Sequence, residues 1–137
     1  MIRVAQLTDP HFTTTGARSH GGRGYDVRSS FRAVQASLGH DAATPDLIVV
    51  TGDIADRGQP SEYELAAALL SELPAPVYAL AGNHDYVVPM ESVLPRCGVA
   101  LPRTIRVENW LFLCPDSNAG GQIRNHLGRL VDTPERV

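Results

Sequence analysis

Three short apolar runs, separated by segments of helical periodicity, organise the N-terminal part of the chain. They cover residues 2–7, 47–50 and 77–81, and each is typical of a buried strand. The middle run has no polar position, as expected for a strand that is covered on both faces. The pattern therefore predicts a βαβαβ unit with parallel strands, in which right-handed crossovers place both helices on one face of the sheet.

The segments between these runs predict two helices. The first covers residues 28–38, with Asp26 as its N-cap. Its inner face is expected to carry the apolar residues at i, i+3 and i+7, which are Phe31, Val34 and Leu38. The second helix begins with a capping box of Ser61 and Glu64 and ends at Pro74. Because each helix connects one predicted strand to the next, the fold class is α/β.

The remaining segments are less regular. Residues 13–24 are polar and glycine-rich, which predicts a mobile loop. Residues 89–102 are punctuated by proline, and no element is predicted there. Residues 104–107 and 110–114 are predicted to form a short hairpin. Residues 133–135 read Thr-Pro-Glu, which is a strong helix-start signal just before the sequence stops.

The bulk composition is that of an ordinary globular protein. The 137 residues are 43% hydrophobic and 20% charged, which fits a single domain over residues 1–137. The formal net charge is −3 and there is no basic stripe, so binding to nucleic acid is not expected. No apolar run approaches the ~20 residues of a membrane-spanning helix, and we expect no secretory signal. Cys97 and Cys114 form no CxxC pair, which favours a reduced, cytoplasmic location.

Side chains that bind metals follow each of the three predicted strands directly. The three segments are Asp9-Pro10-His11, Gly52-Asp53-Ile54-Ala55-Asp56 and Gly82-Asn83-His84-Asp85. If the strands are parallel, all three segments emerge at one edge of the sheet, where open α/β folds bind ligands. One such placement can arise by chance, whereas three in the same relation to successive strands indicate a site.

The residue types within these segments suit a shared pair of cations. On an extended chain, Asp9 and His11 point to the same side about 6.6 Å apart, so both can reach one cation. Asp53 has two carboxylate oxygens and can bridge two cations, and Asn83 offers a neutral oxygen. His84 would then lie at the mouth of the site, with the next residue, Asp85, able to orient its ring.

Plainer interpretations of single residues stay open. Taken alone, Asp53 is equally well explained as a turn residue that ends a strand, and Gly-Asn is a common turn pair. Asp56 and Arg57 are expected to form a local ion pair or cap, with a phosphate contact by Arg57 as the alternative. Three further histidines lie in polar, loop-like surroundings, and for these we expect solvated surface roles: His20, His40 and His126.

The combination of carboxylate, imidazole and amide donors favours Mn, Fe or Zn over Ca, which prefers oxygen-only shells. Two such ions ~3.5–4 Å apart polarise a phosphoryl group and lower the pKa of a bound water to near neutrality. The donor set therefore predicts hydrolysis of a small-molecule phosphoric ester, with two divalent metal ions as cofactors.

In their order and spacing, these segments resemble the motifs of the calcineurin-like metallophosphoesterase superfamily, which run DxH, GDxx(D/N), GNH(D/E), then an isolated His and a GHxH. Tyr25-Asp26 and Cys114-Pro115-Asp116-Ser117 look most like the class III cyclic-nucleotide phosphodiesterase branch. The resemblance implies a four-layer α/β/β/α sandwich, of which this chain supplies the N-terminal half, a βαβαβ unit followed by a β-hairpin. It also implies a phosphodiesterase in which a metal-held hydroxide attacks phosphorus in line.

The resemblance further assigns roles to single residues. It implies four metal ligands, which are Asp9, His11, Asp53 and Asn83. Asp53 would bridge the two ions, and the first two ligands would belong to one ion and Asn83 to the other. His84 would stabilise or protonate the leaving oxygen, while Asp85 holds its ring.

One part of the family's pattern is missing. No GHxH follows Asp85, and His126 matches neither late motif. We therefore expect a C-terminally truncated phosphoesterase domain that is weak or inactive alone. The alternatives are a scaffold or binding module of the same fold, or a split or swapped domain in which another chain supplies the histidines. A missing second sheet would leave an apolar face open, which predicts a dimer or another homo-oligomer, or a self-associating monomer.

Overall fold

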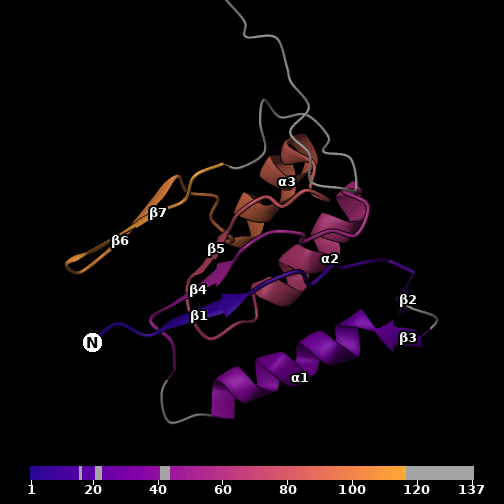
Figure 1. The fold of residues 1–137 in the computed structure, drawn as a ribbon, viewed down its shortest axis with the longest axis horizontal. Coiled ribbons are helices and arrows are strands. Elements are labelled where there is room, and N and C mark those ends of the chain that lie inside the picture. Colours follow the sequence, from indigo (N-terminus) through magenta and orange to yellow (C-terminus); the bar gives the residue numbers. More distant parts are fainter. Residues whose placement is uncertain (16, 21–22, 41–43, 117–137) are drawn as a thin grey trace, which may run out of the picture.

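A parallel sheet lies at the centre of the computed structural model, which describes residues 1–15, 17–20, 23–40 and 44–116. Its strands are, in order, β1 (Val4–Leu7), β4 (Leu47–Val50) and β5 (Val77–Ala79). β4 pairs in parallel with both neighbours (Figure 1). The predicted parallel unit and the α/β class are confirmed, although β1 begins two residues later and β5 ends two residues earlier than predicted.

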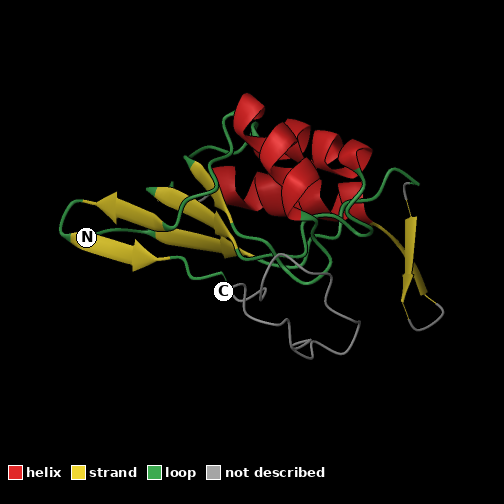
Figure 2. Ribbon diagram, turned by 90° about the horizontal axis from the view of Figure 1, so that it is seen from above, coloured by secondary structure: helices red, strands yellow, loops and turns green. Residues whose placement is uncertain are grey.

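The helices gather on one face of this sheet (Figure 2). They are α1 (Val27–His40), α2 (Pro60–Leu70), α3 (Val87–Val93) and the short 3₁₀ helix η1 (Leu94–Cys97). Ile48 and Val50 of β4 are buried in the main core, together with side chains from each helix, which include Phe31, Tyr63, Leu70, Met90 and Leu94. Both crossover helices therefore lie on one face of the sheet, as predicted.

A hairpin packs on the opposite face of the sheet. It is formed by β6 (Thr104–Val107) and β7 (Trp110–Leu113), which pair antiparallel as predicted. Because side chains alternate along a strand, Leu47 points away from the helices and packs with Ile105 and Cys114 in a second cluster. The middle strand is thus covered on both faces, which explains why it has no polar position.

Part of the second face remains exposed in the described portion of the chain. Val4 of β1 is 45% exposed, and Trp110 and Leu113 of the hairpin are 60% and 71% exposed. Leu111 and Leu113 alternate with Phe112, which packs against the second cluster, so both point away from the sheet. This exposure fits the expectation of an open apolar face, and self-association stays a prediction.

Two expectations drawn from composition concern the membrane and the thiols. Across the described ranges, no helix has the length and apolar character that a membrane crossing requires. Cys97 is exposed, Cys114 is buried, and both are free thiols. The cytoplasmic location stays a prediction.

The structure corrects two of the segments that seemed irregular. Residues 13–24 were expected to form a mobile loop, but β2 (Ala17–His20) and β3 (Arg23–Asp26) pair there as an antiparallel ribbon. Backbone pairing does not require an apolar pattern, so periodicity could not reveal it.

The proline-punctuated segment contains α3, where Pro89 lies in the first turn and its missing N–H costs no helical hydrogen bond. The helix start at residues 133–135 and His126 lie outside the described residues, as do the side chains of His20 and His40.

The start of α1 agrees with the prediction. Asp26 Oδ1 accepts the N–H of Arg28 at 3.0 Å, and Oδ2 accepts the hydroxyl of Ser29 at 2.6 Å, so Asp26 caps the helix. Of the expected inner face, Phe31 is buried but Val34 is 41% exposed. A step of three residues turns about 60° short of a full circle, which places Val34 at the margin of the buried stripe. Val34 nevertheless lines a cavity together with Phe31 and Leu70, so it lies on the inner side of the helix but remains exposed.

The Asp26 cap predicts a pH-dependent stability difference. The Ser29 hydroxyl, followed by backbone N–H groups of α1, lowers the pKa of Asp26 below 3.8. Stabilisation by a depressed carboxyl pKa is present above the unfolded pKa and is lost as the pH falls through the folded pKa. In thermal unfolding, we expect Asp26→Asn to melt below the wild type at about pH 6, and the gap to close toward about pH 2. A gap of equal size at both pH values would contradict this.

The start and end of α2 differ from the prediction. Gln59 is the N-cap, Pro60 occupies the first helical turn, and Glu62 takes the acidic position of the capping box. The box of Ser61 and Glu64 is thus wrong, because proline needs no N–H partner at the helix start and lets the helix begin earlier. Glu62 is 2% exposed, and its Oε2 accepts the N–H groups of Arg57 and Gln59 at 2.9 and 3.0 Å. The helix ends at Leu70, before the predicted end at Pro74.

Candidate metal centre

The three ligand segments meet at one edge of the sheet, as the parallel order requires. The first two run side by side through backbone hydrogen bonds. The N–H of Asp9 donates to the carbonyl of Gly52 at 3.2 Å, and the N–H of His11 donates to the carbonyl of Asp53 at 2.9 Å. Phe12 continues the pairing as a parallel bridge with Ala55. The segments that carry the candidate ligands are therefore fixed to one another by their main chains.

The backbone at the ligand positions is left-handed. Asp9, His11 and Asp53 have φ values of 51°, 44° and 50°, a region that non-glycine residues enter rarely and that costs roughly 1–3 kcal/mol each. The expectation that Asp9 and His11 converge on an extended chain is wrong in its geometry. The two side chains do converge, but through left-handed turns on either side of Pro10. Such strain concentrates at functional sites.

Two glycines allow the second and third segments to touch. A Cβ on Gly82 would lie 2.1 Å from Asp53 Oδ1 and 2.2 Å from its backbone nitrogen. A Cβ on Gly52 would lie 2.8 Å from the Cα of Gly82, and Gly52 has a φ of 106°. These separations are shorter than any side chain tolerates, so the close approach expected at Gly52 is present and Gly82 contributes equally to it.

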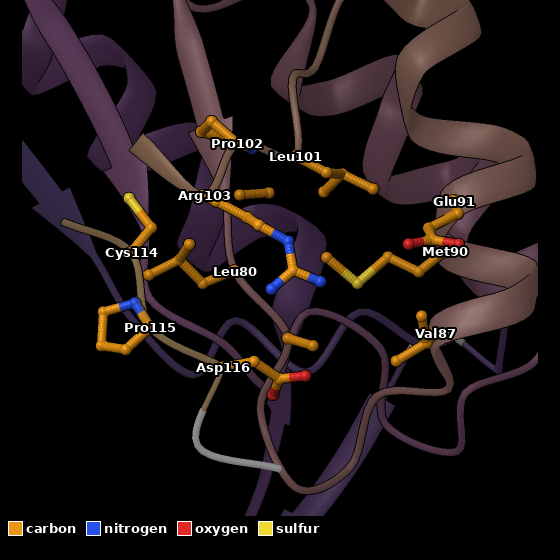
Figure 3. Close-up of a pocket in the computed structure, with 12 residues that line it drawn as sticks. Leu80, Val87, Met90, Glu91, Leu101, Pro102, Arg103, Cys114, Pro115 and Asp116 are labelled. Atoms are coloured by element: carbon orange, nitrogen blue, oxygen red, sulfur yellow. The ribbon is translucent and has the colours of Figure 1, made fainter. Parts of the chain in front are cut away.

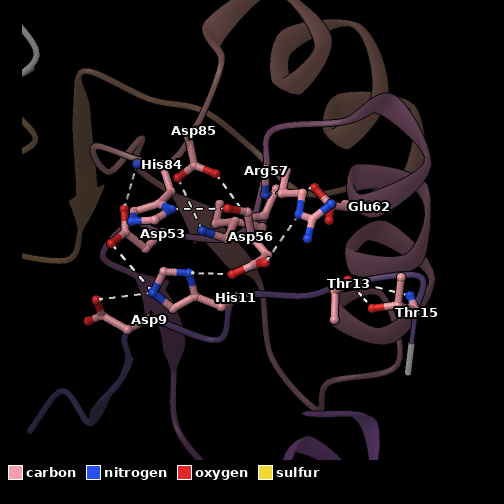
Figure 4. Close-up of polar contacts among 12 residues, drawn as sticks. Asp9, His11, Thr13, Thr15, Asp53, Asp56, Arg57, Glu62, His84 and Asp85 are labelled. Atoms are coloured by element: carbon pink, nitrogen blue, oxygen red, sulfur yellow. Dashed lines mark hydrogen bonds and ion pairs between the residues drawn. The ribbon is translucent and has the colours of Figure 1, made fainter. Parts of the chain in front are cut away.

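Imidazole and carboxylate groups gather where the segments meet (Figure 4). Nε2 of His11 lies 3.6 Å from Asp53 Oδ2 and 3.9 Å from Asp9 Oδ1. The ring of His84 stands edge-on to that of His11, with 4.8 Å between their centroids. One ligand atom from each of His11, Asp53 and His84 lies within 4.8 Å of the others. His11 and Asp53 are each 8% exposed, while the Asp9 side chain is 58% exposed and lies at the entrance.

His84 is held by its main chain and by one ring nitrogen. Its N–H donates to Asp53 Oδ1 at 3.0 Å, and its Nδ1 lies 3.0 Å from the carbonyl oxygen of Asp56. A carbonyl only accepts hydrogen bonds, so Nδ1 carries a proton. Asn83 precedes His84 in the same loop and is half-buried. The third segment therefore brings His84 to the cluster, and Asn83 adjoins it in the chain.

Asp85 differs from its expected position relative to the His84 ring. Its oxygens accept four hydrogen bonds at 2.8 to 3.1 Å, from the N–H groups of Ile54, Ala55 and Gly82 and the hydroxyl of Tyr63. A carboxylate has about four acceptor positions, so these donors fill it. The carbonyl of Asp56 holds the ring nitrogen instead. The carboxylate of Asp85 ties the second segment to the third.

Asp56 contributes more than the local ion pair that was expected. That pair exists, with 3.9 Å between Asp56 Oδ2 and Arg57 Nε. Asp56 Oδ1 also lies 3.6 Å from Nδ1 of His11. A carboxylate on the far nitrogen of a histidine orients the ring and favours binding of a cation at Nε2. In the sequence, Asp56 lies three residues after Asp53, but this spacing does not indicate that Asp56 contacts His11. Tyr63 had no signal, because it looked like an ordinary core residue of its helix.

The donor set fits a divalent cation of borderline character. Two imidazoles and two carboxylates lie at the strand ends, and the side chains of His11, Asp53 and His84 lie close to one another (Figure 4). Carboxylate and imidazole ligands suit Mn, Fe and Zn. The residues that could hold such an ion are the expected Asp9, His11, Asp53 and Asn83, and the ring of His84 lies beside them.

Two cavities lie beside the outer strands of the sheet. One of about 200 Å³ borders Asp9, next to β1, and its wall is mainly apolar and aromatic, with Tyr25 and Phe31 among the lining residues. The other, of about 130 Å³, lies between β5, α3 and the hairpin. The guanidinium of Arg103 points into it, and Glu91 lies across from it (Figure 3). The hollow that borders Asp9 is thus apolar, and the one beside β5 carries charge.

Comparison with known proteins places the chain among phosphoesterases. A family model described as calcineurin-like phosphoesterase matches residues 2–132. A 3′,5′-cyclic-nucleotide phosphodiesterase of Nostoc sp. is 31% identical over 126 residues, which cover 92% of this chain and 47% of that protein. The 3′,5′-cyclic adenosine monophosphate phosphodiesterase CpdA of Escherichia coli K12 is 30% identical over 146 residues, covering 98% of this chain and 52% of CpdA. The chain therefore spans about half the length of these relatives.

A third relative is named for a different class of phosphodiester. The glycerophosphodiester phosphodiesterase GpdQ of Enterobacter lignolyticus is 34% identical over 82 residues, covering 60% of this chain and 29% of GpdQ. The match to the family model includes all three ligand segments and the parallel sheet that presents them. Because the family model matches nearly the whole chain, the chain belongs to the calcineurin-like phosphoesterase family.

Proposed function

We propose that the protein is a metal-dependent phosphoric ester hydrolase, and specifically a phosphodiesterase of the cyclic-nucleotide type. The observation that carries this proposal is the gathering of His11, Asp53 and His84 within 4.8 Å at the carboxyl edge of a parallel sheet. Membership of the phosphoesterase family and the phosphodiesterase names of the relatives support it.

In this proposal the side chains that hold two divalent ions are Asp9, His11, Asp53 and Asn83. When bound, such ions polarise the phosphoryl group and make a bound water acidic. Asp53 is suited to the shared position because the N–H of His84 fixes its Oδ1 at 3.0 Å while its Oδ2 faces His11. His11 in turn has Asp56 on its far nitrogen. Asp53 and His11 are therefore oriented before any ion binds, which limits the reorganisation that binding requires.

His84 is proposed to stabilise or protonate the departing oxygen. The carbonyl of Asp56 accepts from Nδ1, so the proton given to the leaving group must come from Nε2. The hydrogen bond to Asp53 and the carbonyl contact together fix the position of the ring beside the ligands. A positioned general acid contributes about 10²–10⁴-fold to rate.

The cyclic-nucleotide assignment is supported by the apolar cavity that borders Asp9. Its Tyr25 and Phe31 provide flat, apolar surface next to a ligand residue. Small-molecule sites combine such walls with a few polar groups that fix orientation. We therefore propose that the base of the nucleotide occupies this cavity while the phosphodiester lies at the ligands.

The test is hydrolysis of 3′,5′-cyclic AMP and of an activated diaryl phosphodiester in the presence of Mn²⁺. We expect turnover above that of Mn²⁺ in buffer, and we expect removal of Mn²⁺ with a chelator to abolish it. In His84→Gln, kcat should fall by about 100-fold or more, while Mn²⁺ binding measured by calorimetry stays within a few-fold of wild type.

The outcomes separate hydrolysis from a binding role. An unchanged kcat in His84→Gln would remove His84 from the chemistry. Specific, tight Mn²⁺ binding without turnover of either ester would favour the scaffold or binding-module alternative. A rate that rises more steeply than linearly with protein concentration would instead indicate that a second copy completes the site.

A further inference from the structure

A buried polar network lies directly behind the candidate ligands. The carboxylate of Asp85 accepts the backbone N–H groups of Ile54 and Ala55 in the second segment and that of Gly82 in its own segment. Ile54 follows Asp53 in sequence and Gly82 precedes Asn83. The distance between these two ligand residues therefore depends on where the Asp85 carboxylate sits.

Tyr63 fixes that carboxylate from helix α2. The Tyr63 side chain is fully buried, and its hydroxyl donates to Asp85 Oδ1 at 3.1 Å. The same hydroxyl accepts the N–H of Tyr86 at 2.8 Å, just after the third ligand segment. Burial, followed by the charge of Asp85, raises the pKa of Tyr63 far above its usual range. The hydroxyl therefore stays protonated and remains a donor to Asp85.

We propose that Tyr63 is a positioning residue of the metal centre, which sets the spacing between Asp53 and the Asn83-His84 pair through Asp85. The inference rests on the proposed function for the identity of the site, but its geometry involves only the side chains and main chain of this protein. Without the hydroxyl, Asp85 keeps three donors and loses the one that comes from a rigid helix. The N–H of Tyr86 would at the same time lose its acceptor.

A purely structural role would predict something different. If Tyr63 only filled the core, removing its hydroxyl would leave the ring packing and the metal affinity unchanged. If it positions the ligand segments, the affinity for metal should fall even when the fold is intact. Mutation of residues that support the metal ligands typically lowers metal affinity 10–100-fold.

The experiment measures Mn²⁺ affinity by calorimetry in Tyr63→Phe, which keeps the ring and removes one oxygen. We expect an increase in Kd of about tenfold or more. Tyr78→Phe is the matched control, because Tyr78 lies on β5 and packs in the second cluster on the other face of the sheet. Ala66→Gly controls for destabilisation, since it weakens the same helix at a fully buried position outside the network. Both controls should keep the wild-type Kd.

Amide hydrogen exchange in the metal-free protein provides a readout that does not require metal. We expect the N–H groups of Ile54, Ala55, Gly82 and Tyr86 to exchange faster in Tyr63→Phe than in Tyr78→Phe. If the wild type binds no Mn²⁺, the proposed function fails and the exchange rates alone decide this inference. Unchanged exchange at these four amides would overturn it, and so would an unchanged Kd in a wild type that binds Mn²⁺.

Discussion

Asp53→Asn is expected to abolish metal-dependent ester hydrolysis and to weaken Mn²⁺ binding by at least about 100-fold, since even partners behind the ligands cost 10–100-fold. Both oxygens of Asp53 are committed, one to the N–H of His84 and the other toward Nε2 of His11. Asparagine keeps the volume but replaces one acceptor with an amide group that carries only donors. The variant therefore loses the negative charge and the oxygen that faces His11, which are the features a cation would bind.

A matched aspartate variant separates this effect from a general change in charge. Asp46 lies at the opposite end of β4, where its Oδ2 accepts the N–H of Arg3 at 2.7 Å. Asp46→Asn removes the same charge far from the ligand edge, so Mn²⁺ affinity and hydrolysis should stay at the wild-type level. Calorimetry and an ester-hydrolysis assay on both variants provide the comparison. Retention of Mn²⁺ binding in Asp53→Asn would show that the carboxylate is no ligand.

The parallel sheet and its ligand edge could be predicted because one-dimensional patterns encode them. Residues 47–50 are apolar throughout, and the structure covers that strand with helices on one side and the hairpin on the other. Once the strands are parallel, their carboxyl ends share an edge. That alone brings Asp53 close to His84, which lies 31 residues further along the chain, and brings both close to His11.

The local geometry of the site was not predictable in the same way. The left-handed backbone of Asp9 and His11 arises from pairing with the second segment, and sequence spacing contains no information about that pairing. The hydrogen-bond partners of Asp85 could not be predicted from the sequence either. Three of its four donors are backbone N–H groups, which nearly every residue has. Short-range patterns therefore located the candidate ligands but did not indicate their supporting contacts.

The supporting contacts explain how strained ligand positions persist. Left-handed residues are stable only where the surroundings over-determine them. Here the main chain of the first segment is paired with the second, and the second is tied to the third by Asp85. The three segments form one hydrogen-bonded unit behind the ligands. A change in any one contact should therefore affect the whole cluster, and the site of closest approach should be the most sensitive.

Gly82→Ala is accordingly expected to damage both the fold and the metal centre. The added Cβ would lie 2.1 Å from Asp53 Oδ1 and 2.2 Å from the Asp53 backbone nitrogen. Since one of these atoms belongs to the main chain, rotation of a side chain cannot relieve the contact. Overpacking costs about 1–3 kcal/mol and sometimes more, so we expect a loss of about 3 kcal/mol in the free energy of unfolding. Denaturant titration and Mn²⁺ calorimetry measure the two effects.

Gly24→Ala is the matched control, because a Cβ at Gly24 would meet no atom within 4 Å. It makes the same chemical change in the β2–β3 ribbon and should leave stability and Mn²⁺ affinity near wild type. The contrast isolates the contact between the second and third segments from the general effect of replacing glycine. If Gly82→Ala retained wild-type stability and affinity, the two segments would not be in contact in solution. The spacing of Asp53 and Asn83 would then have to be fixed by other means.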